Sequence, residues 1–127
     1  MAKMTIISEN KVGLSVALIA EHGFSAYLET DDLKLLWDTG QGFCLAQNAT
    51  RLGIQFGQVK TIALSHGHFD HTGGLVHALE SVKGGDVFCH PACLTPKKAK
   101  VTIKGQAGVE ISSSATVDVK GSVINLN

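Results

Sequence analysis

Residues 64–74 read LSHGHFDHTGG, and this stretch decides the fold of the chain. It places three histidines and one aspartate within positions 66–71, directly after the β-branched and apolar run 59–64. That run predicts a buried strand, and the segment 72–75 opens an amphipathic helix. The four side chains therefore follow the C-terminal end of a strand, where open α/β sheets place their ligand sites.

Imidazole and carboxylate groups are ligands of Zn²⁺, Fe²⁺ and Mn²⁺. The absence of a neighbouring thiolate argues against a closed structural zinc site. His66 and His68 are two residues apart, so in extended backbone their rings project from the same side. A single histidine more often caps a turn or satisfies a core hydrogen bond. Four ligand-type side chains at this spacing instead favour an open, catalytic type of metal site.

The pattern His66-x-His68-x-Asp70-His71, followed by Thr-Gly-Gly, resembles the signature of the metallo-β-lactamase fold superfamily. Residues 1–96 resemble the N-terminal half of one branch, the metal-dependent hydrolases related to the dihydropterin ribofuranosyl-aminobenzene phosphate synthases. The likeness extends to AEHGFS at 20–25, LWDTG at 36–40 and CHP at 89–91. It implies an α/β fold that is half of the family's αββα sandwich, a mixed sheet with covering helices.

The same resemblance implies an enzyme, a hydrolase that uses metal-activated water on a small-molecule ester, phosphoester or lactone-like substrate. It implies two divalent transition metals, zinc first and iron or manganese as alternatives. In the family pattern His66 and His68 bind one metal, and Asp70 and His71 bind the other. Asp70 is also the implied catalytic residue, and Asp38 orients a ligand through a hydrogen bond. A plain turn is the alternative for Asp38.

Two further histidines are candidates for contact with the substrate. His22 precedes a glycine in a predicted loop, and His90 follows a predicted buried strand. Both fall near the metal face in the family arrangement. A solvated loop histidine and a strand-end histidine are the alternatives.

The length of the chain limits this assignment. The four-layer sandwich is larger than 127 residues allow. After Pro91 there is no histidine, and the acidic residues are Glu110 and Asp118. The first metal thus has two protein ligands, where a catalytic zinc has three and a water. We therefore expect a truncated hydrolase with impaired activity. The alternative is a non-catalytic assembly module with a vestigial metal site.

Composition excludes several other classes. With 11 basic and 11 acidic residues, the chain has no net charge to attract nucleic acid. No apolar stretch approaches the roughly 20 residues that span a bilayer, and residues 1–4 lack the character of a signal peptide. The chain has three cysteines, Cys44, Cys89 and Cys93. Because this number is odd and their spacing is not that of paired disulfide bridges, we expect reduced thiols. We expect a cytoplasmic protein without a membrane partner.

The order of local patterns predicts one sheet covered by helices. The expected elements are strand 5–8, a hairpin of strands 24–29 and 33–38, helix 43–52 ending at Gly53, strand 59–64, helix 74–82 and strand 86–90.

From Val101 the chain becomes rich in Gly, Ser and Thr and repeats every eight residues. The repeats are VTI at 101–103, VEI at 109–111 and VDV at 117–119. They resemble the octapeptide β-helix repeat of phage and type VI secretion spike proteins; a single hairpin or a partly disordered tail is the alternative. We predict two domains, 1–96 and a β-repeat tail at 97–127. Homo-oligomers would form through the tail or through pairing of half-sandwiches.

Overall fold

The computed structural model describes residues 1–13, 17–82 and 84–96. Residues Met1–Pro96 form one compact unit. The predicted repeat tail and its spike-like character lie outside the described residues.

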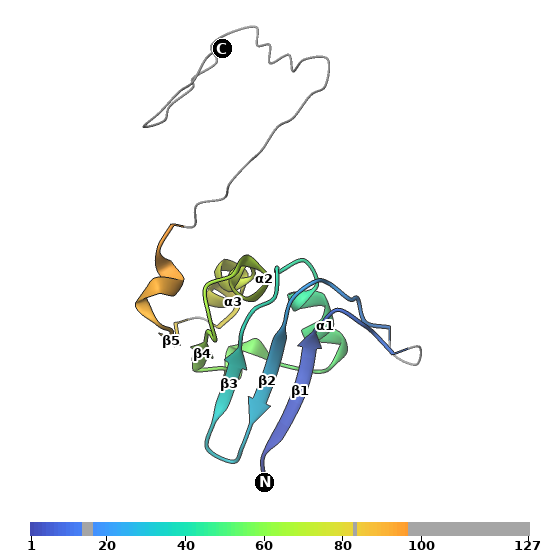
Figure 1. Cartoon of the computed structure of the whole chain (residues 1–127). Coiled ribbons are helices and arrows are strands. Elements are labelled where there is room, and N and C mark those ends of the chain that lie inside the picture. Colours follow the sequence, from blue (N-terminus) through green and yellow to red (C-terminus); the bar gives the residue numbers. More distant parts are fainter. Residues whose placement is uncertain (14–16, 83, 97–127) are drawn as a thin grey trace, which may run out of the picture. The chain divides into compact units, whose positions relative to one another are not determined.

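One mixed sheet organises this unit, in the order β1-β2-β3-β4-β5 (Figure 1). β1 pairs with β2 and β2 with β3 in antiparallel fashion, whereas β3, β4 and β5 run parallel. The C-terminal ends of the three parallel strands therefore meet at one edge of the sheet. The strands are Lys3–Ser8, Ser25–Glu29, Lys34–Trp37, Thr61–Ala63 and Asp86–Phe88. The predicted α/β class with a mixed sheet is confirmed.

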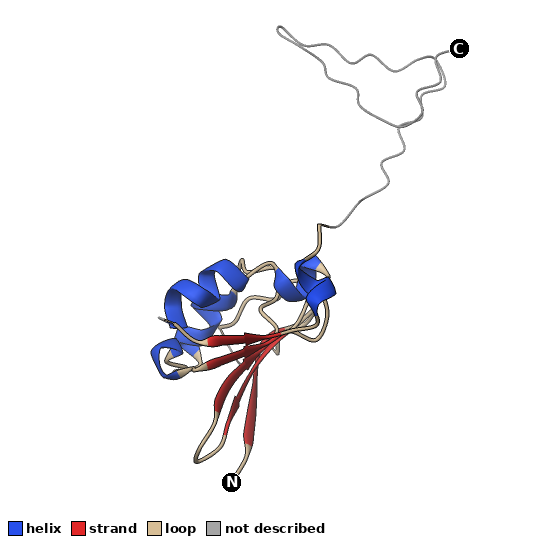
Figure 2. Cartoon of the chain, turned by 90° about the vertical axis from the view of Figure 1, so that its left-hand side faces the viewer, coloured by secondary structure: helices blue, strands red, loops and turns tan. Residues whose placement is uncertain are grey.

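The helices lie on one side of this sheet (Figure 2). They are α1 (Leu45–Arg51), α2 (Phe69–Thr72) and α3 (Leu75–Val82), with the 3-10 turns η1 (Phe56–Gln58) and η2 (Pro91–Leu94). The core forms where Leu36 and Ile62 of the sheet meet apolar side chains of α1 and α3, among them Leu45, Ala78 and Val82. In the described ranges no helix is long and apolar enough to cross a membrane.

Local chemistry accounts for the elements that the sequence predicts. The β2–β3 turn closes as expected around Thr30, whose Oγ1 accepts from the amides of Asp32 and Leu33 at 3.2 and 2.9 Å. Helix α1 stops before Gly53, which has φ +72°. A glycine adopts this left-handed conformation without the cost that a Cβ adds, so it terminates the helix.

Two predictions differ from the structure. The helix expected from residue 72 is preceded by α2, which begins at Phe69 inside the signature. It forms because the carbonyl of His68 accepts from the amides of His71 and Thr72 at 3.0 and 3.1 Å. The strand before His90 was predicted to be buried, which is wrong: β5 is an edge strand, and Phe88 is 61% exposed.

Candidate metal centre

The signature side chains lie together just beyond the C-terminal end of β4. His66 Nε2 is 3.1 Å from His68 Nδ1, and the rings of His66 and His71 have centroids 4.1 Å apart. Asp70 Oδ2 lies 3.5 Å from His71 Nε2. The extended backbone at His68 and the short helix α2 after it bring the four residues to one place.

Asp38, which follows β3, is buried and forms hydrogen bonds with two residues of this segment, Ser65 and His71. Its Oδ1 accepts from the Ser65 amide at 2.8 Å, and its Oδ2 is 2.8 Å from His71 Nδ1. A carboxylate oxygen is an acceptor, so Nδ1 of His71 donates to Asp38, and Nε2 is the ring nitrogen that remains for a ligand. Nε2 faces Asp70 Oδ2.

The backbone of Asp38 has φ 54°, which makes it the one non-glycine residue with positive φ in the described ranges. Aspartate and asparagine tolerate this left-handed region better than most residues, at some cost in energy. Its amide donates to the Ala63 carbonyl at 2.8 Å, and its carbonyl accepts from Ser25 Oγ at 2.9 Å. These bonds hold the carboxylate beneath His71.

Ser65 is a site residue that we did not identify from the sequence. Its Oγ donates to Asp38 Oδ2 at 2.6 Å and lies 2.9 Å from His66 Nδ1. Because its own proton is directed to Asp38, the hydroxyl oxygen accepts from His66 Nδ1, and this leaves Nε2 of His66 unprotonated. The available signal was its place in residues 64–74, between the strand and the first histidine of the signature.

The backbone of Asp70 and His71 is fixed by two neighbouring segments. Thr39 donates to the His71 carbonyl through its amide at 2.8 Å and its Oγ1 at 3.0 Å. The Phe24 amide donates to the Asp70 carbonyl at 3.2 Å. Gly23 has φ +129°, and a Cβ there would lie 2.1 Å from the Asp70 carbonyl oxygen. Close approach of this loop therefore requires a glycine at position 23.

Glu21 is a second residue that the sequence analysis missed. Its carboxylate accepts hydrogen bonds at 3.0 to 3.3 Å from four consecutive amides, those of Gln41, Gly42, Phe43 and Cys44. Ser8 Oγ donates to it at 3.1 Å. The side chain thus holds the loop between Asp38 and α1 and satisfies amides at the start of that helix. Burial, with Glu21 adding to it, raises the pKa of the Cys44 thiol.

The two predicted substrate-binding histidines occupy different surroundings. His22 is 73% exposed, and its Nε2 lies 3.5 Å from Asp70 Oδ2, while Nδ1 is 3.2 Å from Asn10 Oδ1. The structure therefore places His22 beside the signature. His90 instead caps η2, where its Nδ1 accepts from the Ala92 amide at 3.2 Å.

The nitrogen and oxygen atoms of the signature are of the types that bind transition metals, and two pairs of them have a separation close to that of two ligands on one metal. Two ligands of a tetrahedral zinc, bound at about 2.0–2.1 Å, are about 3.3 Å apart. The His66 Nε2–His68 Nδ1 pair at 3.1 Å, which shares a hydrogen bond in this structure, and the Asp70 Oδ2–His71 Nε2 pair at 3.5 Å are close to this separation. In residues 1–13, 17–82 and 84–96, however, no three His, Cys, Asp or Glu side chains form a group that could hold a metal ion. The chain thus provides paired donors but no complete set within its described part.

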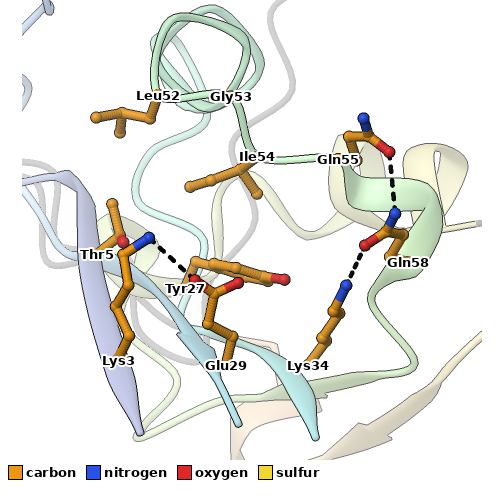
Figure 3. A pocket seen from close by; sticks show the side chains of 10 residues that line it. All are labelled: Lys3, Thr5, Tyr27, Glu29, Lys34, Leu52, Gly53, Ile54, Gln55 and Gln58. Carbon is orange, nitrogen blue, oxygen red and sulfur yellow. Dashed lines mark hydrogen bonds and ion pairs between the residues drawn. The ribbon is translucent and has the colours of Figure 1, made fainter. Parts of the chain in front are cut away.

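A cleft of about 200 Å³ lies at the opposite end of the strands (Figure 3). It is polar: Lys3 Nζ pairs with Glu29 at 3.0 Å, and Lys34 Nζ donates to Gln58. Burial, followed by the charge of Glu29, raises the pKa of Tyr27 at its floor. None of the signature residues lines it. The cleft is therefore separate from the candidate metal centre.

Comparison with known proteins places these residues in a family. The model of the metallo-beta-lactamase superfamily matches residues 19–91. An uncharacterized protein of Methanocaldococcus jannaschii is 36% identical over 81 residues, which are 63% of this chain and 32% of that protein. The 7,8-dihydropterin-6-methyl-4-(beta-D-ribofuranosyl)-aminobenzene-5'-phosphate synthase of the same organism is 30% identical over 95 residues, which are 70% of this chain and 32% of the synthase.

Solved structures with similarity include the Rm3 metallo-beta-lactamase, which is 29% identical with a TM-score of 0.49 over 55% of this chain and 27% of that one. A metallo-beta-lactamase of Cronobacter sakazakii is 25% identical with a TM-score of 0.47, covering 54% of this chain and 26% of that one.

This chain spans about a third of the length of the curated relatives, 32% in both cases. Members of the matched superfamily bind divalent metals, generally zinc. The matched segment, residues 19–91, includes His22, Asp38 and the whole signature, and it makes up more than half of the chain. The chain therefore belongs to the metallo-beta-lactamase superfamily, of whose fold it carries a part.

Proposed function

We propose that this chain carries the metal centre of a metal-dependent hydrolase for small molecules with an ester, phosphoester or lactone-like group. The observation that supports this most directly is the contact of Asp38 Oδ2 with His71 Nδ1 at 2.8 Å. A buried carboxylate that orients a histidine in this way is a frequent partner of metal ligands, and it sets the free nitrogen toward the metal.

The proposed ligands are His66 and His68 for one divalent metal, and Asp70 and His71 for the other, with zinc as the first choice and iron or manganese as alternatives. A bound metal supplies Lewis acidity and activates a water molecule. Asp70 is also the carboxylate that we assign to the reaction, since its Oδ2 faces His71 Nε2 and His22 Nε2, both at 3.5 Å.

His22 is assigned to the substrate. Its ring is 73% exposed, and its Nε2 points to the edge of the cluster at Asp70. An imidazole in this position can donate to a polar or anionic oxygen of a bound molecule. His90 stays a weaker candidate, because its Nδ1 is engaged with the Ala92 amide.

The phosphate in the name of the M. jannaschii synthase supports a phosphorylated substrate. That relative is named a synthase, so its name does not support hydrolysis as such.

Turnover is expected to be weak. Each proposed metal has two donors from the described residues, and loosely held metals activate water and position substrates poorly. The family match supports the hydrolase rather than the alternative of a non-catalytic assembly module.

The test is a screen of phosphodiester, phosphomonoester, ester and lactone substrates with Zn²⁺, Mn²⁺ or Fe²⁺, using the full chain. We expect slow hydrolysis above the metal-only blank, abolished by Asp70→Ala. The matched control is His77→Ala, because His77 is a 68% exposed histidine of α3 that pairs with Glu80 away from the signature. Equal rates for Asp70→Ala and the unmodified chain would refute the assignment. Fast, Asp70-dependent turnover would refute the expected impairment.

A further inference from the structure

The end of β1 lies at the same edge of the sheet as the signature (Figure 1). β1 is antiparallel to β2 and β2 is antiparallel to β3, so β1 runs in the same direction as β3 and β4. Its last residue, Ser8, donates through Oγ to Glu21 at 3.1 Å. Asn10 follows two residues later and contacts the next residues of the same loop, His22 and Gly23. The segment that matches the family model does not include Asn10.

The oxygen of the Asn10 amide fixes the hydrogen-bonding role of one ring nitrogen of His22. The Gly23 amide donates to this side chain at 3.1 Å, and because a backbone N–H can only donate, the atom that faces it is Oδ1. The same Oδ1 lies 3.2 Å from His22 Nδ1. A carbonyl oxygen only accepts, so His22 Nδ1 is the donor. Nε2 is therefore the ring nitrogen that remains for a bound molecule, and it lies 3.5 Å from Asp70 Oδ2.

The orientation of the His22 ring depends on the contact with Asn10. The His22 side chain is 73% exposed, so packing restricts it weakly, and an exposed side chain without a fixed partner moves between several rotamers. In the described residues its second polar contact is with Asp70 Oδ2 at 3.5 Å, which is longer than an ordinary hydrogen bond. The hydrogen bond to Asn10 is thus the stronger of the two contacts that hold the ring.

The backbone that carries His22 is held by other bonds. The Phe24 amide donates to the Asp70 carbonyl at 3.2 Å, and the Glu21 carboxylate accepts from the amides of residues 41–44. Loss of the Asn10 oxygen would therefore free the ring, while the main chain on both sides of it stays in place.

We propose that Asn10 is a positioning residue of the proposed hydrolase, which holds the His22 ring with Nδ1 toward Asn10 and Nε2 toward the bound substrate. This role rests on the proposed contact of His22 with the substrate. Asn10 acts through His22 and does not itself touch the substrate. A ring that is already oriented loses less conformational entropy when the substrate binds, so the role of Asn10 is expressed in substrate binding more than in the chemical step.

The position of the ring is tested by NMR on the metal-free full chain at pH 8. Long-range proton–nitrogen correlation spectra show which nitrogen of each histidine ring carries hydrogen, and the signals that disappear in His22→Gln are those of His22. We expect hydrogen at Nδ1 of His22 in the unmodified chain, because Asn10 accepts from it. Asn10→Asp keeps an acceptor oxygen in the same place and should retain this pattern, whereas Asn10→Ala should lose it. Gln47→Ala, which removes an exposed amide side chain of α1, is the control and should leave the His22 signals unchanged.

The consequence for the substrate is tested by hydrolysis of bis(p-nitrophenyl) phosphate with Zn²⁺. Asn10→Ala should raise KM by about 2- to 10-fold, the range for one lost hydrogen bond, with a smaller change in kcat. In a His22→Gln background the same change should have no further effect on KM, because the residue through which Asn10 acts is absent. Gln47→Ala should keep the KM of the unmodified chain. Circular dichroism checks that each variant folds, and Asn10→Leu replaces Asn10→Ala if that variant does not.

Hydrogen at Nε2 alone of His22 in the unmodified chain would overturn the proposal, and so would unchanged His22 signals in folded Asn10→Ala. A rise in KM that is equally large in the His22→Gln background would also overturn it, since Asn10 would then act through another residue. Absence of hydrolysis in the unmodified chain would refute the proposed function, while the spectra still decide whether Asn10 holds the ring.

Discussion

Asp38 and His71 are 33 residues apart in the chain, and their side chains meet at 2.8 Å between Oδ2 and Nδ1. Asp38 directly follows β3, and His71 lies in α2, which follows β4. Because β3 and β4 are parallel neighbours, both residues arrive at the same edge of the sheet. The contact joins the proposed metal centre to the fold, so we expect a change at Asp38 to affect the proposed ligand His71 as well as the core.

We expect Asp38→Asn to weaken zinc binding by about 10–100-fold, the range found when a hydrogen-bond partner of a metal ligand is removed. Asparagine has the same shape and tolerates positive φ, so the change tests the carboxylate rather than the backbone. A competition titration with a chromogenic chelator measures the affinity. Asp32→Asn, in the exposed β2–β3 turn, is the control and should bind zinc as the unmodified chain does. Unchanged affinity in Asp38→Asn would contradict the role proposed for this carboxylate.

The purified chain should contain at least about half an equivalent of a transition metal, and the double change His66→Ala, His68→Ala should remove most of it. Each metal has few ligands from this chain, so the loss of two leaves the site too weak to retain its ion. Elemental analysis by mass spectrometry after dialysis measures the content. The single change His77→Ala controls for the loss of a surface histidine. Equal metal in the double variant and the control would exclude the signature as the binding site.

Gly23→Ala should destabilise the fold by more than about 2 kcal/mol. The new Cβ would lie 2.1 Å from the Asp70 carbonyl oxygen, and the backbone has φ +129°. Gly53→Ala is a matched control, because it too has positive φ, +72°, but a Cβ there meets no atom within 4 Å. The control should cost about 1–2 kcal/mol, the usual penalty for a left-handed residue with a Cβ. Urea unfolding measures both values, and equal losses would show that the Asp70 contact is unimportant.

Of the three cysteines, Cys44 should resist alkylation in the folded protein. It is fully buried, whereas Cys89 and Cys93 are partly exposed. Burial raises the pKa of the Cys44 thiol, so less of the reactive thiolate is present at a given pH. Mass spectrometry after treatment with iodoacetamide at pH 8 should show two modified thiols in the folded chain and three in urea. Rapid modification of all three without urea would contradict this.

The same pKa shift has a consequence for stability. The folded pKa of Cys44 lies above its ordinary value of 9.0, so the unfolded chain releases this proton first. The contribution of Cys44 to stability is therefore intact below that pH and falls as the pH rises above it. Cys44→Ala should flatten the decline of the urea midpoint between pH 8 and pH 10. A decline equally steep in the variant would show that another group causes it.

Local patterns in the sequence were sufficient to predict most of the sheet and the position of the signature. The hairpin turn at Thr30, the end of α1 before Gly53 and the cluster of signature side chains after β4 depend on residues close to one another in the chain. Alternation, turn chemistry and residue spacing therefore predict them, whereas the role of the cluster as a metal site stays a prediction. The β5 strand was predicted as well, but its exposure was not, because exposure depends on its place at the edge of the sheet.

Contacts between distant segments were decided by the tertiary structure alone. Ser65 reaches Asp38 across 27 positions, Glu21 reaches the amides of 41–44 across about 20, and His22 meets Asp70. None of these pairs has a local pattern. Ser65 meets Asp38 because the parallel strands β3 and β4 end at the same edge of the sheet, and Glu21 and His22 reach that edge because β2, which is antiparallel to β3, begins there.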